Sequence, residues 1–185
     1  MMKKRMANLS RKTKETDIEI SIVLNGSGTC QIECKDQFLR HMLETLGKYA
    51  SFDLAMKIVG DNEHHLIEDT AIVLGMALRQ AIHDAPIERI SSATVPMDDA
   101  LVTVAVDLID RPYADIECPN DLYRHFLRSF AMASGITLHV IVQRGFDEHH
   151  IIEATFKALG LALKNAALQR KDVLSTKETP RIRRE

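Results

Sequence analysis

The sequence is poor in several features that would place it in particular classes of protein. Its 185 residues include only three cysteines, with no Cys-x-x-Cys pair. An odd, small number of cysteines favours reduced thiols in a cytoplasmic protein. The net charge is only −2, so overall electrostatics give no reason to expect nucleic acid or an anionic membrane as a partner.

Long apolar runs are also missing. No stretch approaches the roughly 20 residues that a membrane-spanning helix needs. Residues 1–6 are basic, but residues 7–11 supply no apolar core of a signal peptide. We therefore expect no membrane partner. Hydrophobic residues still make up 45% of the chain, which is enough for a packed core.

A duplicated cluster of histidine and glutamate stands out instead. The string Glu-His-His-x-Ile-Glu begins at Glu63 and again at Glu148, each time at the start of a segment with helical apolar periodicity. Each helical residue turns by about 100°, so His64 and Glu68 lie about 40° apart while His65 points aside. One helix start can thus offer a His and a Glu to one metal ion and a second His to another. The second copy repeats this arrangement with His149, Glu153 and His150.

The duplication extends over most of the chain. Residues 38–43 match residues 122–127 at an offset of 84, and residues 63–81 match residues 148–166 at an offset of 85. A unit of about 65 residues would be marginal by itself, so the two halves should share one core. We divide the chain into a first repeat unit at 1–84, a linker at 85–99, a second repeat unit at 100–168 and a polar tail at 169–185, all in one domain.

Each unit is predicted to have the order β-β-α-β-α, with its first two strands forming a β-hairpin. Asp36 and Asn120 are candidate N-caps of the first helices. Helices on one face of a small, mostly antiparallel sheet indicate the α+β class. The predicted elements are strands at 18–24 and 30–34, a helix at 37–49, a strand at 52–59 and a helix from about 64, then strands at 102–108 and 114–118, a helix at 121–133, a strand at 136–143 and a helix from about 149.

Six histidines in three duplicated positions, with two glutamates, form a candidate set of metal ligands. A His and a Glu four residues apart on a helix converge on one point, as in helical zinc motifs. Without cysteine ligands, Mn, Zn, Fe, Co and Ni remain. Four protein ligands would close a tetrahedral zinc site but leave two open positions on an octahedral ion. The candidate ligands are His41, His64, His65, Glu68, His125, His149, His150 and Glu153.

Two other functions are compatible with this set. The sites could be closed structural centres that stabilise an assembly of chains. They could also belong to a two-metal hydrolase, although such enzymes favour carboxylates that bridge the two ions. About two ions per chain, with open positions, would favour an enzyme.

The chain resembles the imidazoleglycerol-phosphate dehydratases, lyases of histidine biosynthesis. The two His-His-x-x-Glu elements in this order are the most specific part of the resemblance. The resemblance covers nearly the whole chain, through residues 11–16, 41–43, 64–69, 95–101, 107–113, 125–126, 149–158 and 175–177. It implies a tandem duplication of the ribosomal protein S5 domain 2-like type, with helices packed between two sheets.

The resemblance also implies two Mn²⁺ ions per active site, at a site shared between subunits of a 24-subunit homo-oligomer. Other divalent ions are possible. Carried over by position, one ion would take His41, His65, His149 and Glu153. The other ion would take His64, Glu68, His125 and His150. This partition agrees with the helix angles above.

The reaction implied is the dehydration of D-erythro-imidazole-glycerol phosphate to imidazole-acetol phosphate. The substrate carries an imidazole ring, itself a metal ligand, and the departing proton sits on an unactivated carbon, so a carboxylate must move protons. The resemblance points to Glu15, with the ligands Glu68 and Glu153 as further catalytic candidates. Besides Glu15, the substrate-binding residues implied are Arg89, Arg111, Ser175, Thr176 and Lys177, which match phosphate contacts.

Overall fold

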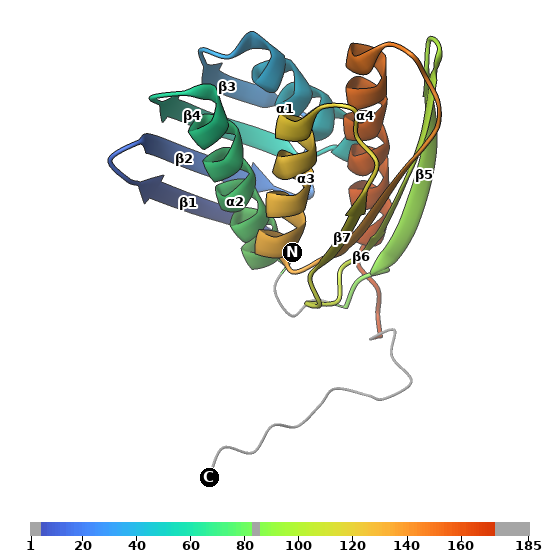
Figure 1. Cartoon of the computed structure of the whole chain (residues 1–185). Coiled ribbons are helices and arrows are strands. Elements are labelled where there is room, and N and C mark those ends of the chain that lie inside the picture. Colours follow the sequence, from blue (N-terminus) through green and yellow to red (C-terminus); the bar gives the residue numbers. More distant parts are fainter. Residues whose placement is uncertain (1–4, 83–85, 173–185) are drawn as a thin grey trace.

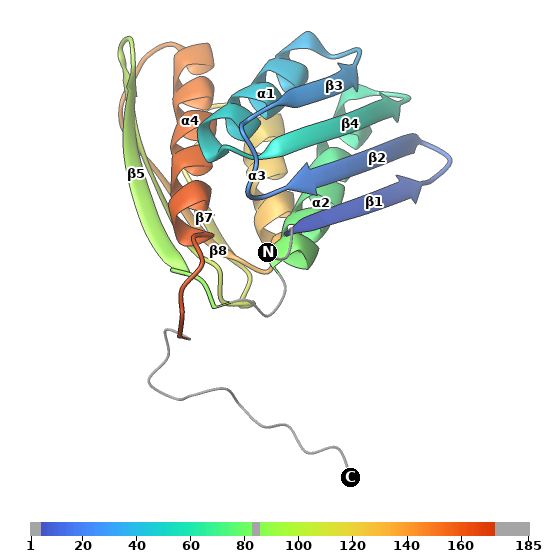
Figure 2. The ribbon, with the colours of Figure 1, turned by 180° about the vertical axis from the view of Figure 1, so that it is seen from behind.

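A computed structural model describes residues 5–82 and 86–172. The two repeat units build two four-stranded sheets that lie on either side of the four described helices (Figures 1 and 2). The first unit contains β1 (Met6–Lys12), β2 (Thr16–Val23), β3 (Cys30–Cys34), α1 (Gln37–Ala50), β4 (Asp53–Gly60) and α2 (Glu63–Ile82). The second contains β5 (Ile90–Met97), β6 (Ala100–Asp107), β7 (Tyr113–Ile116), α3 (Asp121–Ser134), β8 (Thr137–Arg144) and α4 (Glu148–Ala166).

The predicted α+β class, the duplication and the helices between two sheets are confirmed, but the predicted hairpins are wrong. The strand orders are β1-β2-β4-β3 and β5-β6-β8-β7. β4 lies between β2 and β3, antiparallel to β2 and parallel to β3. The alternation of residues 18–34 indicates two strands and a turn, but it carries no information about which strand each one pairs with.

Each unit has one strand more than predicted, β1 or β5, at its start. This extra strand forms the hairpin, so the observed hairpins are β1–β2 and β5–β6. β5 lies within the stretch predicted as the linker. Edge strands bury few side chains, and β5 is mostly exposed or half-buried, so it lacks a strong apolar alternation. It also contains Pro96, which an edge strand tolerates because one of its sides makes no ladder hydrogen bonds.

The helix starts follow the predicted capping chemistry. Asp36 accepts a hydrogen bond from the Leu39 N–H, and Asn120 accepts from Leu122 and Tyr123, so both predicted N-caps are confirmed. A third cap, Asp147, accepts from the N–H groups of the two histidines that begin the second motif. These caps set where α1, α3 and α4 begin.

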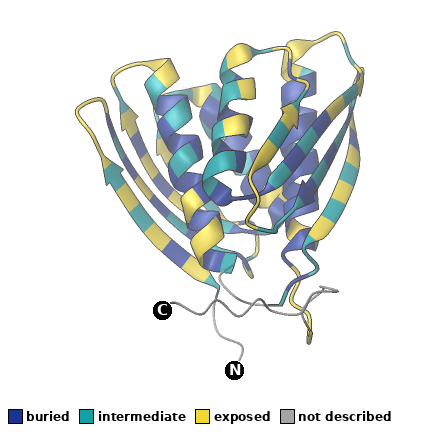
Figure 3. Cartoon of the chain, turned by 60° about the horizontal axis from the view of Figure 1, so that its bottom comes forward, coloured by how far each residue is buried: buried dark blue, intermediate teal, exposed yellow. Residues whose placement is uncertain are grey.

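The helices of the two copies pack against each other in the pairs α2 with α3 and α1 with α4. Both pairs meet at a repeated glycine. A Cβ at Gly75 would lie 2.7 Å from the Phe130 carbonyl oxygen, and one at Gly160 would lie 2.9 Å from that of Leu46. The buried side chains form one cluster with members from both copies, between the partly exposed strands (Figure 3). None of the described helices is long and apolar enough to cross a membrane.

Candidate metal centres and active site

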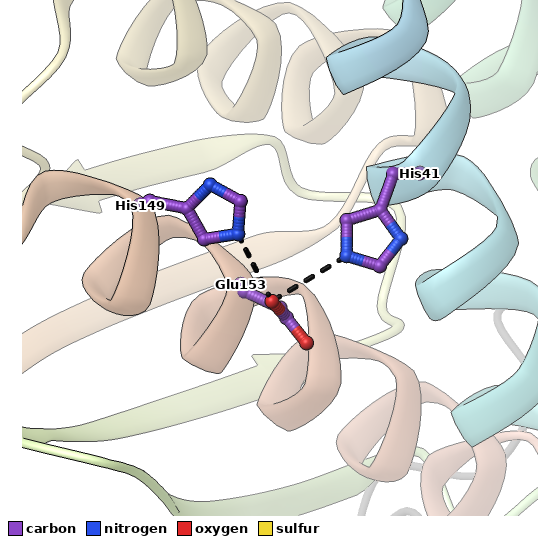
Figure 4. Close-up of side chains that lie close together, drawn as sticks. All are labelled: His41, His149 and Glu153. Carbon is purple, nitrogen blue, oxygen red and sulfur yellow. Dashed lines mark ion pairs between the residues drawn. The ribbon is translucent and has the colours of Figure 1, made fainter.

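The first group of candidate ligands joins α1 of one copy to the start of α4 of the other. The Glu153 carboxylate lies between two histidines (Figure 4). Its Oε2 atom is 3.4 Å from His41 Nε2 and 3.3 Å from His149 Nε2. The candidate ligand atoms of these three residues all lie within 4.8 Å of one another, as ligands of one ion would.

The second group is the repeat-related counterpart, between the start of α2 and α3. Glu68 Oε2 lies 3.6 Å from His64 Nε2, and Glu68 Oε1 lies 3.2 Å from His125 Nε2. The His125 Nε2 atom is buried and makes no hydrogen bond to any described residue. A buried nitrogen without a hydrogen bond is costly, and a divalent ion between His125 and Glu68 would satisfy it. The donor set therefore fits a metal ion.

The fold explains why each group combines the two copies. A His and a Glu one helical turn apart point to one side of α2 or α4. The facing helix, which is held close at Gly75 or Gly160 about two turns further along, then supplies the third residue. The sequence predicted the pairs on each helix, and the helix packing selects which histidine of the other copy joins them.

The remaining two candidate ligands, His65 and His150, lie apart from these groups and are held by carboxylates. His65 Nδ1 is 2.9 Å from Asp61 Oδ1, and His150 Nδ1 is 2.6 Å from Asp99 Oδ1. These hydrogen bonds raise the pKa of both imidazoles. A carboxylate bound to Nδ1 fixes the ring and leaves Nε2 for another partner, as is common beside metal-ligating histidines. In His150, this Nε2 atom lies 3.3 Å from Asp98 Oδ2. Within one chain, six of the eight predicted ligands thus form two groups of three.

Glu15 lies in the β1–β2 turn, close to the first motif. Its carboxylate Oε2 is 3.8 Å from His65 Nδ1. The backbone of the turn is held on both sides: the Glu15 N–H donates to Thr13 Oγ1, and the Glu15 carbonyl accepts from the Asp61 N–H. The side chain itself remains about half exposed. It is therefore placed at the histidine end of the first sheet and accessible.

The predicted phosphate contacts lie elsewhere. Arg89 makes a two-pronged contact with Asp107, with Nε 2.7 Å from Oδ1 and Nη2 3.0 Å from Oδ2. Arg111 follows the same end of β6. The start of α4, which carries His149, lies near the other end, where β5 turns into β6 (Figure 1) and Asp99 accepts from the Asp147 N–H. A strand of eight residues is roughly 25 Å long, so one chain does not bring these arginines to its own histidines. Ser175, Thr176 and Lys177 lie outside the described residues.

Lys157 was not predicted, although it contacts the first group. Its Nζ lies 2.9 Å from Glu153 Oε1, and only 15% of its side chain is exposed. Burial tends to raise the pKa of Glu153, but hydrogen bonds from Lys157 and His41 outweigh it, so the pKa is lowered. The carboxylate is thereby kept ionised, as a metal ligand must be. The i+4 spacing from Glu153 was the available signal for this residue.

Comparisons with known proteins converge on one family. A family model described as imidazoleglycerol-phosphate dehydratase matches residues 35–163. The dehydratase of Methanosarcina mazei is 44% identical over 190 residues, covering 95% of this chain and 99% of that protein. The one from Acetivibrio thermocellus is 46% identical over 192 residues, covering 94% and 97%. A crystal structure of the Pyrococcus furiosus dehydratase, in complex with a ligand, superposes with a TM-score of 0.80 at 37% identity, covering 93% of this chain and 100% of that one.

Proposed function

The chain belongs to the imidazoleglycerol-phosphate dehydratase family and is a hydro-lyase, and from this premise we propose its substrate, cofactor and site. We propose that it dehydrates D-erythro-imidazole-glycerol phosphate to imidazole-acetol phosphate in histidine biosynthesis, in the cytoplasm, using two divalent ions per active site. The observation that carries the proposal is the pair of His-His-Glu groups at repeat-related positions.

Mn²⁺ is the proposed ion, and other divalent ions are possible with these ligands. One ion would bind His41, His149 and Glu153, and the other would bind His64, Glu68 and His125. The fourth ligands, His65 and His150, would then come from neighbouring chains, because each lies outside both groups of its own chain. Self-association, with 24 subunits as the proposed number, would therefore complete the metal centres.

The separation of the arginines from the histidines supports the same conclusion. Arg89 and Arg111 lie at the opposite end of β6 from His149, so a substrate that touches both needs two chains. Asp107 holds the Arg89 guanidinium in one orientation, which would reduce the entropy lost when a phosphate binds. Ser175, Thr176 and Lys177 are proposed to complete the phosphate site.

The proposed chemistry divides between the ions and the protein. When bound, divalent ions would act as Lewis acids toward the imidazole ring and the hydroxyl that leaves. Glu15 would move the proton, because its carboxylate is accessible and lies beside His65. Asp61 and Asp99 would hold the two outer histidines in the tautomer that presents Nε2. Glu68 and Glu153 would serve as ligands and as alternative proton carriers.

A direct assay tests this proposal. Protein freed of metal with a chelator should not consume imidazoleglycerol phosphate, and added Mn²⁺ should restore the formation of a ketone product. Sizing chromatography in parallel should show smaller species without metal, since an ion bound between chains contributes to association. Metal-dependent assembly without any dehydration would instead identify a structural metal protein. Full activity in verified metal-free protein would contradict the proposed cofactor.

A further inference from the structure

A buried carboxylate behind the second metal group has no role in the mechanism proposed above. Asp69 follows the ligand Glu68 on α2, one helical turn after His65, and its side chain contacts the first sheet. It is 8% exposed. Its Oδ2 atom accepts a hydrogen bond of 2.5 Å from Thr16 Oγ1 and forms an ion pair with Arg11. Both partners flank the β1–β2 turn, one on each strand.

These contacts lead directly to Glu15. Thr16 is the next residue in the chain and is buried. Thr13 Oγ1 accepts from the N–H groups of Glu15 and Thr16, at 3.1 and 2.9 Å. It also lies 3.1 Å from Thr16 Oγ1. The hydroxyl groups of Thr13 and Thr16 thus hold the turn that carries Glu15. Asp69 connects this turn to α2 through its hydrogen bond from Thr16.

The second copy builds the same place without any of these polar groups. The strand pairing supports the alignment of the copies, because Arg11 lies opposite Ile18 and Val95 lies opposite Val102, each 84 residues further on. The second-copy residues at these positions are apolar and buried. That turn is instead held to α4 through Asp99, which accepts from the N–H groups of Phe146 and Asp147. The equivalent positions are Val95 for Arg11, Ala100 for Thr16 and Ala154 for Asp69.

A buried charge costs free energy unless it is well paired, and apolar replacements are often neutral or stabilising. The first copy keeps the polar network at the one turn that carries Glu15. We infer that Asp69 is a positioning residue for the dehydration, which acts through Thr16 and Arg11 to hold Glu15 beside the metal site. The inference rests on the proposed function. Asp69 would act through the position of the Glu15 carboxylate, since a misplacement of a catalytic group by about 1 Å can cost on the order of a hundredfold in rate.

The test replaces the three polar residues of the first copy by the apolar residues found at the equivalent positions of the second copy. The triple variant Arg11→Val, Thr16→Ala and Asp69→Ala should keep its bound Mn²⁺ and its assembly. Its kcat should fall at least about tenfold while KM changes less than about threefold, because substrate binding is spared. The milder variant Asp69→Asn keeps an acceptor for Thr16 but loses the attraction to Arg11. It should fold and show an intermediate kcat.

Asp53→Asn is the matched control. Asp53 also ties a loop of the same sheet, through the N–H groups of Ser27 and Thr29, but at the opposite end of β4 from α2. It should lower the melting temperature without changing kcat. A merely structural role for Asp69 predicts the same behaviour for the Asp69 variants, so the split between kcat and stability decides between the two roles.

The outcomes separate this inference from the proposed function. If Glu15→Gln is inactive while the triple variant, or Asp69→Asn where the triple variant does not fold, turns over at the wild-type rate, the positioning role alone is overturned. If excess Mn²⁺ restores the kcat of the triple variant, Asp69 acts on metal binding through its neighbour Glu68, and the inference is also overturned. Wild-type turnover in Glu15→Gln would remove the proton-transfer role on which both depend.

Discussion

Glu15 and Asp99 occupy the same place in the two copies, but they make different contacts. Each is the residue just before a repeat-related strand, and each lies beside the second histidine of its copy. Asp99 Oδ1 is 2.6 Å from His150 Nδ1, whereas Glu15 Oε2 is 3.8 Å from His65 Nδ1 because Asp61 occupies the direct position. The first copy thus has a second carboxylate that is not needed to hold the ring, as the proton-transfer role proposed for Glu15 requires.

His65 and His150, the two candidate ligands outside the groups of three, should bind different ions. We expect His65→Ala and His150→Ala each to lower the affinity for one of two bound ions, because each removes one proposed ligand. Losses of this kind at a metal centre are large, and even outer contacts are worth about 10- to 100-fold in affinity. Equilibrium dialysis against Mn²⁺ measures both affinities. His139→Ala, which changes a partly exposed histidine outside both groups, is the control. Two ions at wild-type affinity in both variants would refute the assignment.

Replacing Glu15 by Gln should separate catalysis from binding. The variant keeps the size and hydrogen bonding of the side chain but removes the proton carrier. We expect kcat to fall by about 10² or more with little change in KM. Steady-state kinetics on metal-loaded protein provide the measurement, and bound Mn²⁺ should remain unchanged. If the rate is unaltered, the proton carrier must be sought in Glu68 or Glu153.

The glycines at the helix contacts should tolerate no side chain. In an exposed helix, Gly→Ala stabilises by up to about 1 kcal/mol. At Gly160 the added Cβ would lie 2.8 Å from the Tyr49 Cβ and 2.9 Å from the Leu46 carbonyl oxygen. We expect Gly160→Ala to lower the free energy of unfolding by about 1–3 kcal/mol instead. Chemical denaturation measures it, with Met76→Ala at a half-exposed helical position as control. A stabilised Gly160→Ala would mean that the helices can separate freely.

The Asp53 carboxylate, which holds the loop between β2 and β3, should make the free energy of unfolding depend on pH. Hydrogen bonds from the N–H groups of Ser27 and Thr29 lower the pKa of Asp53 below its ordinary value of 3.8. A lowered pKa in the folded state contributes stability that is present above the ordinary pKa and is lost as pH falls through the folded one. Asp53→Asn should therefore be less stable than the wild type at pH 7, and this difference should shrink below pH 4. Urea unfolding of metal-free protein at several pH values checks this. A difference independent of pH would show that the charge of Asp53 is not involved.

Local signals were enough for much of the molecule. The helix caps Asp36 and Asn120 lie where short polar side chains precede an apolar-periodic segment, because capping depends only on nearby backbone groups. The side-by-side placement of His64 and Glu68 follows from helical geometry alone. The repeat itself indicated that two such groups exist. The same local signals were insufficient for β1 and β5, whose exposed edges leave no strong pattern.

Long-range pairing was decided only by the tertiary structure. Nothing within residues 18–34 indicates that β4 separates β2 from β3, because strand pairing depends on the whole sheet. Likewise, the packing of α2 on α3 and of α1 on α4 selects His125 and His41 as partners of the two helix starts, and it leaves His65 and His150 outside both groups. The sequence by itself determined which residue types carry the chemistry and how they are spaced on each helix. The packing of one copy against the other decided which of them meet, since contacts between distant segments arise only when apolar surfaces of both copies are buried together.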